Sequence, residues 1–509
     1  MNIEAVLKEK FKYESFRPGQ REIIMDLLDG HNVVAMLPTG GGKSITYQIP
    51  AFVREGAVVI VSPLLSLMED QVDQLRLIGE KRVIAFNSFR TYEEKQKAMQ
   101  NIQTYKFIFV SPEMLQSRIF VRAMKRTNIS LFVVDEAHCI SQWGYDFRPD
   151  YQRLHNVITE LDSPPVLALT ATATREMLDD IVNTLQLKDV KLHLFSIDRP
   201  NIAFCVERVD STEEKKRVLL DYVKRLEGPG IIYCSSRYWS EAIALYLRDE
   251  GVMGVSHYHG GMDQEDRMLI QQQFIHDQLR IISCTSAFGM GINKPNVRYV
   301  IHFQYPSNIE SYLQEIGRAG RDQQDSVAIV LLSAADHEVP ISMISSELPQ
   351  TELIEGFVST LVQERTSMIS LERTEEVARN IIGFTEQHWR FVYFQLESLG
   401  IIEGEWLDKE KLGLAAASSI SEAAATLLQQ KMNKLRAMQR WLSTNECRRL
   451  GLLQLFGYRL DHHPDHCCDL CGIDVNYYCK SNNKEEKEQK DWRMHLGQLF
   501  YLNMWREHE

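Results

Sequence analysis

Long hydrophobic stretches are missing from this chain of 509 residues. It has no run of 18 apolar residues, and this excludes a simple membrane-spanning helix. Its first 16 residues mix charged and aromatic side chains and lack the apolar core of a signal peptide. We therefore expect a cytoplasmic protein without a membrane partner.

An excess of positive charge is also missing, because the formal net charge is −12. This value argues weakly against a uniformly basic protein that coats DNA, although it allows local positive grooves. The nine cysteines, an odd number in a cytosolic chain, favour metal ligands or free thiols over disulfides. The 44% hydrophobic and 25% charged residues are typical of a globular enzyme, and the length predicts about three or four domains.

A glycine-rich turn follows the apolar segment 33–37 and leads to Lys43 and Ser44. Glycines let backbone N–H groups crowd around phosphate oxygens, and a helix that begins after them directs its positive end at the same anion. Lys43 would then contact the β- and γ-phosphates of ATP, and the Ser44 hydroxyl would hold Mg²⁺. Leu37 replaces the glycine usually found seven residues before the serine, so a plain strand-to-helix turn remains the alternative. The candidate nucleotide-binding residues of this loop are Thr39, Gly40, Gly41, Gly42, Lys43 and Ser44.

A second apolar segment, 130–134, ends in Asp135 and Glu136. An acid at the end of a buried parallel strand beside a phosphate loop lies where a Mg²⁺-bound water needs an acceptor, so we expect Asp135 on the metal side. Glu136 is then the candidate base for the attacking water, and His138 completes the Asp-Glu-Ala-His motif among the catalytic candidates. A solvated acidic turn is the alternative, which is common for one carboxylate but rare for this motif after such a loop.

Tyr13, Arg17 and Gln20 precede an amphipathic helix near the start of the chain. A glutamine amide can pair with one edge of a purine, and an aromatic ring with a guanidinium can enclose its faces. These three residues could therefore select adenine. An ordinary turn at the start of a helix is equally compatible with the pattern.

The loop that follows His138 is rich in aromatic residues and includes Gln142, Trp143, Phe147 and Arg148. Aromatic faces stack on unpaired bases and arginine meets phosphate, which is how sequence-tolerant binding of single strands works. The loop therefore predicts a contact with single-stranded nucleic acid. A hydrophobic loop tucked under the sheet is the alternative.

Strands and helices alternate from residue 57 to 187 and again from about residue 228. This alternation predicts two α/β domains with parallel sheets and functional loops at the strand ends. The second region has no phosphate loop of its own, but it ends in Arg318 and Arg321, which we expect on one face of a helix. They could reach across an interdomain cleft as arginine fingers, although a surface salt-bridge pair is the alternative.

In this order, the motifs FRPGQ, LPTGGGKS, DEAHCISQWGYDFRPDY, LTATA, YHGGM, FGMGINKP and QEIGRAGRD closely resemble those of the RecQ family of DNA helicases, in its short bacterial form. The resemblance covers residues 11–335. It implies two RecA-like domains that clamp ATP, and 3′→5′ movement along single-stranded DNA in recombination and repair. By position, it implies that Tyr13, Arg17 and Gln20 bind adenine. It implies that the loop with Trp143, Phe147 and Arg148 couples DNA binding to ATP hydrolysis. Arg321 would be the main arginine finger, assisted by Arg318.

The resemblance also sets the expected partners and the alternatives. We expect single-stranded and branched DNA, a monomer, and, in a bacterium, association with the nucleoid; single-strand-binding and recombination proteins are further candidates. An RNA helicase is the runner-up, since Asp-Glu-Ala-His occurs there too. A DNA-binding remodeller without processive unwinding is the second alternative. Tyr145 and Asn293 depart from the family, where histidine and aspartate are common.

Four cysteines near the end of the chain suit a tetrahedral Zn²⁺ site. Cys447 lies about twenty residues before Cys467, Cys468 and Cys471. The adjacent pair is unusual for a zinc knuckle and leaves His462, His463 and His466 as possible substitutes. The resemblance favours the four cysteines, because RecQ proteins carry a zinc module with the same Cys-Arg-Arg and Cys-Asp-x-Cys parts. Cys479 is expected to lie outside the site.

Between the motor and the zinc module, helical patterns at 374–382 and 385–399 precede a strand-like stretch near residue 401. This order is that of a winged helix, although a simple helical connector fits nearly as well. The predicted fold is thus α/β, with two RecA-like parallel-sheet domains followed by a mainly helical region. The expected domains are 1–205 and 206–340 for the motor, 341–430 for the insertion, 431–480 for the zinc module and 481–509 for a charged tail too short for a further winged helix or a terminal helical domain.

Overall fold

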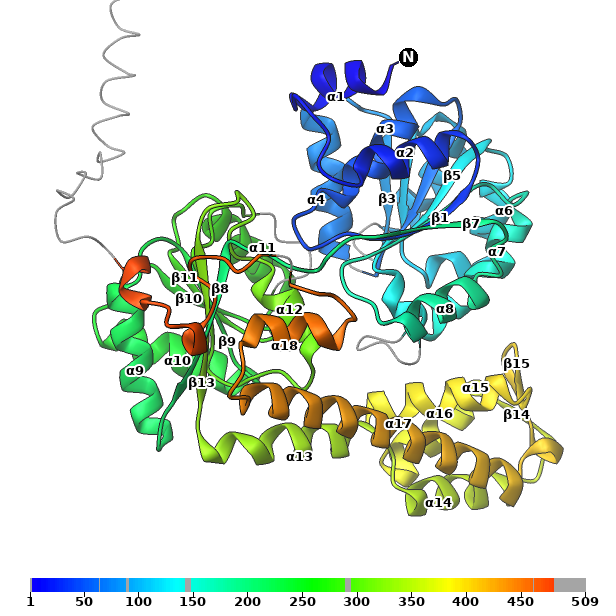
Figure 1. Ribbon diagram of the computed structural model, residues 1–509. Coiled ribbons are helices and arrows are strands. Elements are labelled where there is room, and N and C mark those ends of the chain that lie inside the picture. Colours follow the sequence, from blue (N-terminus) through cyan, green and yellow to red (C-terminus); the bar gives the residue numbers. More distant parts are fainter. Residues whose placement is uncertain are drawn as a thin grey trace, which may run out of the picture.

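The computed structural model describes residues 2–63, 65–87, 91–141, 148–288, 294–460 and 462–479. Two parallel sheets lie side by side, and a long helix carries a smaller helical unit beneath the first of them (Figure 1). Within the described residues, no helix is both long and apolar enough to cross a membrane.

The first sheet has seven parallel strands in the order β3-β4-β2-β5-β6-β1-β7. Strands β1 to β6 are runs of apolar residues because helices cover both faces of the sheet. In β1, Val33 and Ala35 pack into one core and Val34 and Met36 into the other. The strands are β1 (Asn32–Met36), β2 (Ala57–Val61), β3 (Val83–Phe86), β4 (Phe107–Val110), β5 (Ile129–Val134), β6 (Val166–Thr170) and β7 (Val190–Leu194).

Eight α-helices belong to this first domain in the described residues: α1 (Ile3–Phe11), α2 (Gln20–Leu28), α3 (Lys43–Val53), α4 (Leu65–Leu77), α5 (Tyr92–Gln100), α6 (Arg118–Met124), α7 (Leu154–Glu160) and α8 (Arg175–Thr184). Short 3-10 turns connect them: η1 (Ile102–Thr104), η2 (Met114–Gln116), η3 (Ala137–Ile140) and η4 (Pro149–Arg153). The strands end at one edge of the sheet, so the loops after β1, β5 and β6 come together there.

The second sheet has six parallel strands in the order β10-β11-β9-β12-β13-β8. The chain passes to it between β7 and β8, so the expected boundary at 205/206 falls inside β8. The strands are β8 (Ile202–Arg208), β9 (Gly230–Tyr233), β10 (Val255–Tyr258), β11 (Ile281–Cys284), β12 (Tyr299–His302) and β13 (Ser326–Leu332). The helices are α9 (Thr212–Arg225), α10 (Arg237–Asp249), α11 (Gln264–Ile275) and α12 (Ile309–Ile316), followed after β13 by η5 (Ala334–His337).

A helical unit is inserted between α13 (Glu338–Glu347) and the long helix α17 (Leu414–Leu442). Its elements run in the order helix, strand, helix, helix and hairpin, which is the order of a winged helix, and its strands form an antiparallel sheet in the order β14-β16-β15. We call residues 351–408 the winged-helix unit. Its elements are α14 (Thr351–Val362), β14 (Met368–Ser370), α15 (Leu371–Glu376), the π-helix η6 (Val377–Ile382), α16 (Glu386–Ser398), β15 (Ile402–Glu403) and β16 (Trp406–Asp408), with η7 (Lys409–Lys411) after it.

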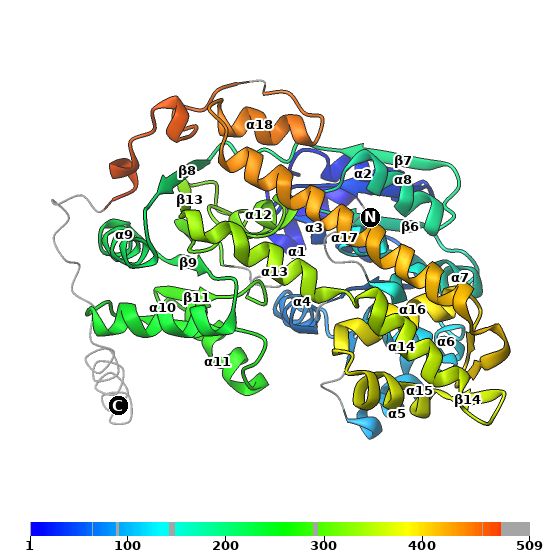
Figure 2. The same ribbon diagram turned by 90° about the horizontal axis from the view of Figure 1, so that it is seen from below.

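Helix α17 links this unit to the rest of the molecule. It has 29 residues, so it spans about 43 Å. Seen from below, it crosses from the winged-helix unit to α18 (Arg448–Leu455), which lies between the two domains (Figure 2). The described chain then ends in the short turns η8 (Asp469–Cys471) and η9 (Val475–Tyr478) against the second sheet.

Candidate active site

The glycine turn after β1 forms the rim of a deep cleft between the two domains. Gly40 and Gly42 have φ angles of 82° and 76°, which side chains rarely adopt. Lys43 is the first residue of α3, so the start of this helix faces the cleft. The cleft encloses about 660 Å³, a size that suits a nucleotide. Thr39, Gly40, Gly42, Lys43 and Ser44 line it, whereas Gly41 faces Pro38.

Asp135 and Glu136 follow β5 and reach the same cleft. The Lys43 Nζ lies 3.4 Å from the Glu136 Oε1, and both side chains are largely buried. Burial raises the pKa of Asp135 to about 6, with the charge of Glu136 adding to the effect. Burial also acts to raise the pKa of Glu136, but Lys43 and His138 outweigh it and hold that pKa below its ordinary value. Glu136 is therefore ionised at neutral pH and is the pair's member that holds its charge to lower pH, so it can accept a proton.

His138 is fully buried beneath the acids. Its Nδ1 lies 3.2 Å from the Thr170 Oγ1 and 3.4 Å from the Glu136 Oε2. The Thr170 hydroxyl donates to the Thr172 carbonyl at 3.0 Å, so its oxygen accepts from the histidine Nδ1–H. His138 thus connects the acids to the Leu169–Ala173 segment, which lines a different part of the interdomain region.

Tyr13, Arg17 and Gln20 lie at the same cleft. The Gln20 amide donates to the carbonyls of Gly41 and Gly42 at 3.1 and 3.0 Å, and its oxygen accepts from the Arg17 N–H at 2.9 Å. The Arg17 side chain donates to the Gly40 carbonyl. Two of the three residues thus brace the phosphate loop directly, a contact that the motif alone did not suggest. Tyr13 is 52% exposed and presents its ring to the cleft.

Arg318 and Arg321 reach the cleft from the second domain. The prediction that they share one helix face was wrong, because α12 ends at Ile316 and Gly320, at a φ of 52°, continues a turn. The Arg318 Nε donates to the Tyr233 hydroxyl at 2.8 Å. A Cβ placed on Gly40 would lie 3.3 Å from the Arg321 Cγ, so the finger candidate lies against the phosphate loop.

This region concentrates positive charge. Burial lowers the pKa of Arg321 to about 9, and the neighbouring charges of Arg318 and Arg199 lower it further. Burial is the main cause of this shift, and Arg318 and Arg199 place further positive charge beside the guanidinium. An anion bound in the cleft would balance it. Ser44 and Asp135 offer oxygen ligands in the same cleft, which suits a small divalent cation such as Mg²⁺.

The four predicted cysteine ligands converge at a second site. Their sulfur atoms all lie within 4.8 Å of one another, with Cys447 Sγ 3.6 Å from Cys467 Sγ and Cys468 Sγ 3.5 Å from Cys471 Sγ. Tetrahedral Zn²⁺ with four thiolates requires separations of about 3.8 Å, so the donor set fits. Among the described residues, Cys479 and the histidines 462, 463 and 466 do not belong to this cluster.

The predicted DNA-coupling residues are only partly described. Gln142, Trp143 and Phe147 lie outside the described residues. Arg148 donates from its backbone N–H to the Cys139 carbonyl at 3.0 Å and from its side chain to the Pro63 carbonyl at 3.0 Å. Arg148 therefore lies against η3, which follows Asp135 and Glu136 in the chain.

Arg199 and Arg449 are the residues that sequence reasoning missed. The Arg449 guanidinium is buried over the Phe204 ring and bonds to Asp198 and to the Arg199 carbonyl. Arg199 stands in no pattern with a spacing rule, and the Cys-Arg-Arg pattern that contains Arg449 does not indicate what its guanidinium contacts. Both act on the segment that joins the two sheets.

Three family models match the chain. They are the DEAD/DEAH box helicase over residues 17–181, the helicase conserved C-terminal domain over 214–323, and the RecQ zinc-binding domain over 408–472. A probable ATP-dependent DNA helicase RecS of Bacillus subtilis is 42% identical over 506 residues, covering 98% of each chain. The chain belongs to the RecQ family of ATP-dependent DNA helicases.

Other RecQ relatives match the motor region. The ATP-dependent DNA helicase RecQ of Haemophilus influenzae is 42% identical over 350 residues, which is 68% of this chain and 56% of that protein. This RecQ-family chain thus spans about half the length of that relative. Most of the winged-helix unit, residues 351–407, falls outside all three family matches.

Solved structures of helicases share the fold. The Mycobacterium smegmatis helicase Lhr, bound to single-stranded DNA and AMP-PNP, matches with a TM-score of 0.56 at 17% identity over 82% of this chain and 62% of its own. Mss116p, bound to single-stranded RNA and AMP-PNP, matches with a TM-score of 0.57 at 16% identity over 86% and 92%. The two-sheet helicase core is therefore the fold of this RecQ-family protein.

Proposed function

We propose that this protein hydrolyses ATP in the interdomain cleft to move 3′→5′ along single-stranded DNA and unwind duplexes. One observation carries the proposal: Lys43 and Glu136 from the first sheet and Arg318 and Arg321 from the second face the same cleft. A cleft built from both domains lets nucleotide binding and hydrolysis change how the domains meet. That change is what moves a strand bound across them.

The proposed roles follow from the geometry. Lys43 and the phosphate-loop N–H groups hold the triphosphate. Glu136, ionised and buried, accepts the proton of the attacking water, while Arg318 and Arg321 stabilise the negative charge that develops on the γ-phosphoryl oxygens. A Mg²⁺ ion held by Ser44 and Asp135 would supply further charge neutralisation. His138 orients the Glu136 carboxylate from the protein interior. Arg17 and Gln20 hold the phosphate loop in place, and Tyr13 stacks on the adenine.

The proposed DNA contact is the loop with Gln142, Trp143, Phe147 and Arg148. It begins directly after η3 and returns to the Cys139 carbonyl through Arg148, so a strand bound there would act on the segment that carries Glu136. Branched DNA as the preferred substrate, a monomeric state and contacts with single-strand-binding or recombination proteins remain predictions of the family resemblance.

The decisive experiment compares Lys43→Ala with the wild type on a 3′-tailed DNA duplex, a 5′-tailed DNA duplex and a tailed RNA duplex. We expect wild-type unwinding of the 3′-tailed DNA only, and loss of both unwinding and ATP hydrolysis in the variant. Binding of a fluorescent single strand should persist, because Lys43 faces phosphate. Hydrolysis within about tenfold of wild type would refute the site, since a charge that contacts the transferred group is worth more than this. Unwinding of RNA or of the 5′-tailed duplex would refute the substrate or the direction.

A further inference from the structure

Arg199 lies in the segment between β7 and β8 and contacts both domains at once. Its Nη1 donates to the Thr39 carbonyl at 2.7 Å and to the Gly317 carbonyl at 3.2 Å. Its Nη2 donates to the carbonyls of Ala319 and Gly320 at 3.1 and 2.6 Å. One guanidinium therefore joins the phosphate loop of the first domain to the turn that carries Arg318 and Arg321 in the second.

These contacts suit arginine and no other side chain. The planar guanidinium presents five N–H donors in a fixed fork, so it can satisfy several carbonyls in one geometry, whereas a lysine ammonium is a single point of charge. Burial and the charge of Arg17 lower the pKa of Arg199 to about 10, so it remains charged at neutral pH. The domains also meet closely here, since a Cβ on Gly317 would lie 2.8 Å from the Thr39 Cβ.

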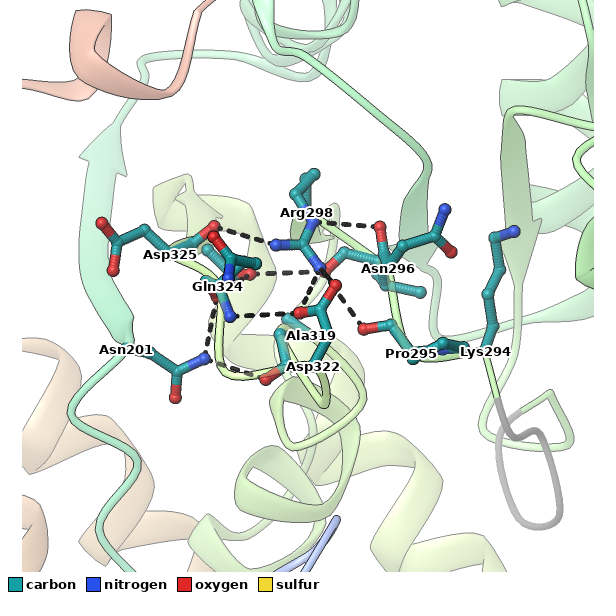
Figure 3. Close-up of polar contacts among 12 residues, drawn as sticks. Asn201, Lys294, Pro295, Asn296, Arg298, Ala319, Asp322, Gln324 and Asp325 are labelled. Carbon is teal, nitrogen blue, oxygen red and sulfur yellow. Dashed lines mark hydrogen bonds and ion pairs between the residues drawn. The ribbon is translucent and has the colours of Figure 1, made fainter. Parts of the chain in front are cut away.

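Other residues hold the same turn from within the second domain (Figure 3). The Asn201 amide donates to the carbonyls of Gly320 and Gln324, both at 2.9 Å. The Arg298 guanidinium donates to both carboxylate oxygens of Asp322 at 2.6 Å. These contacts shape the turn but do not reach the phosphate loop. Arg199 adds hydrogen bonds that reach both this turn and the phosphate loop.

A residue of the zinc module contacts the backbone of Arg199 and the side chain of Asp198. The Arg449 guanidinium, two residues after Cys447, bonds to Asp198 and donates to the Arg199 carbonyl at 3.1 Å. It is 1% exposed and also donates to the Ile202 carbonyl. The Asp198 side chain and the carbonyls of Arg199 and Ile202 are thereby bonded to α18.

We propose that Arg199 is a positioning residue for ATP hydrolysis, which sets the distance between the phosphate loop and the two arginine fingers, and that Arg449 of the zinc module holds it in place. The inference rests on the proposed roles of the phosphate loop and of Arg321. Without the Arg199 fork, the finger turn keeps its internal contacts and loses its register against Thr39. A displacement of about 1 Å at a reacting group can cost about a hundredfold in rate.

The test is a double-mutant cycle between Arg199→Ala and Arg321→Ala. Its readout is the steady-state rate of ATP hydrolysis with saturating single-stranded DNA. We expect Arg199→Ala to lower kcat about 30- to 100-fold and the affinity for a fluorescent ATP analogue about threefold or less. In the Arg321→Ala background the same change should cost little more, because Arg199 acts through that finger. Arg199→Lys, which keeps charge and reach but loses the fork, should fall between, and the neighbouring exposed Arg208→Ala should match wild type.

Two controls keep the outcomes distinct. The thermal midpoint and zinc content of each variant report folding; if Arg199→Ala does not fold, Arg199→Lys carries the same cycle. Fully additive losses, or a kcat within about twofold of wild type in both Arg199 variants, would overturn the inference. If Arg321→Ala itself hydrolyses ATP normally, the proposed site is wrong, whereas an impaired Arg321→Ala beside normal Arg199 variants refutes only the inference.

Discussion

Asp70 is a largely buried carboxyl where α4 of the first domain meets α11 of the second. The Gln271 amide donates to its Oδ2 at 3.3 Å. Burial raises the pKa of Asp70 to about 6, and the nearby Asp73 and Glu69 contribute to the shift. At neutral pH the folded protein therefore holds an ionised acid that this interface disfavours.

Replacing Asp70 with Asn removes the charge and keeps an oxygen that accepts from Gln271. Because the folded-state pKa lies above the ordinary 3.8, the folded protein binds this proton more tightly than the unfolded chain. That stability is complete below about pH 4 and is lost as the pH rises through 6. We expect Asp70→Asn to raise the free energy of unfolding by about 1 kcal/mol at pH 7.5, discounted for partial exposure, and by less near pH 4.5.

Thermal midpoints measured at pH 4.5, 6 and 7.5 check this prediction. The exposed Asp249→Asn on α10 is the matched control and should show no such trend. A stabilisation by Asp70→Asn that is larger at pH 4.5 than at pH 7.5 would contradict the assignment, because the sign of the linkage would then be reversed.

The residues that line the candidate site differ in how far the sequence could predict their positions. Lys43, Asp135 and Glu136 could be predicted because each motif is contiguous and its chemistry depends on local spacing. Arg199 could not, because its partners lie 160 positions earlier and about 120 positions later and meet only in the folded molecule. The brace that Gln20 makes to the phosphate loop is of the same kind: a motif can indicate that an amide is needed but not what it contacts.

At the scale of elements, the winged-helix unit carries an excess of negative charge, which disfavours binding to the DNA phosphates. Residues 351–408 contain eleven acidic and four basic side chains. Helix α16 faces the first domain, where Glu397 forms an ion pair with Arg153 beside α7. The hairpin between β15 and β16 carries Glu403, Glu405 and Asp408 around Trp406, which is 50% exposed. Phosphate repulsion at such a hairpin disfavours a role in splitting strands.

We therefore expect Trp406→Ala, alone or with Glu405→Ala, to unwind a 3′-tailed duplex at a rate within about twofold of wild type, since an exposed side chain away from special features contributes little. The measurement is the unwinding rate in stopped flow, with the rate of ATP hydrolysis recorded on the same samples. Ser398→Ala, exposed on α16, is the control. Loss of unwinding with intact DNA-stimulated ATPase would instead make this hairpin the strand separator.

The zinc module is joined to the second sheet by a backbone hydrogen bond and is held together internally by one ion pair. The Phe204 N–H in β8 donates to the Cys467 carbonyl at 3.2 Å. Arg448 binds both oxygens of Asp469 at 2.6 and 2.9 Å and is almost fully buried. Four thiolates leave no open position for a water on the metal, so zinc here can hold a fold but cannot activate a nucleophile.

Cys468→Ser should consequently lower zinc content and soluble yield together, because the ligand contributes folding free energy. Cys479→Ser provides the control: its thiol lies outside the cluster in the described residues, and it should retain one zinc per chain. Metal content by atomic emission and the thermal midpoint are the two readouts. A Cys468→Ser protein that lacks zinc yet melts and unwinds like wild type would show that the metal is dispensable.

For the whole molecule, the alternation of strands and helices was enough to predict two parallel sheets. Few other folds combine buried apolar strands with functional loops at the strand ends. The insertion was harder. Helical periodicity at 374–399 fits a connector as well as a winged helix, and only the pairing of β14 with β16, about forty residues apart, distinguishes them. The end of α12 was missed: the helix stops at Ile316, with Gly317 as its C-cap, just before the arginines that were expected on it.

On the proposed roles of Arg318 and Arg321, the arginine cluster at the interface makes ATP hydrolysis depend on both domains together. Arg321 lies against Gly40 of the other domain and is partly buried, with Arg318 and Arg199 beside it. A cation delivered across an interface to the γ-phosphoryl group contributes mainly in the transition state, where about 10³- to 10⁵-fold in kcat is typical of an arginine finger. Ground-state binding depends more on Lys43 and the loop N–H groups.

We expect Arg321→Ala to lower kcat for ATP about a thousandfold while the affinity for a non-hydrolysable ATP analogue changes about threefold or less. Arg321→Lys should recover only a small part of the rate, because a point charge lacks the planar fork. The exposed Arg225→Ala on α9 is a control for loss of an arginine from the same domain. A kcat for Arg321→Ala within about tenfold of wild type, or a matching collapse of analogue affinity, would mean that Arg321 binds the nucleotide ground state or serves the interface instead of the transition state.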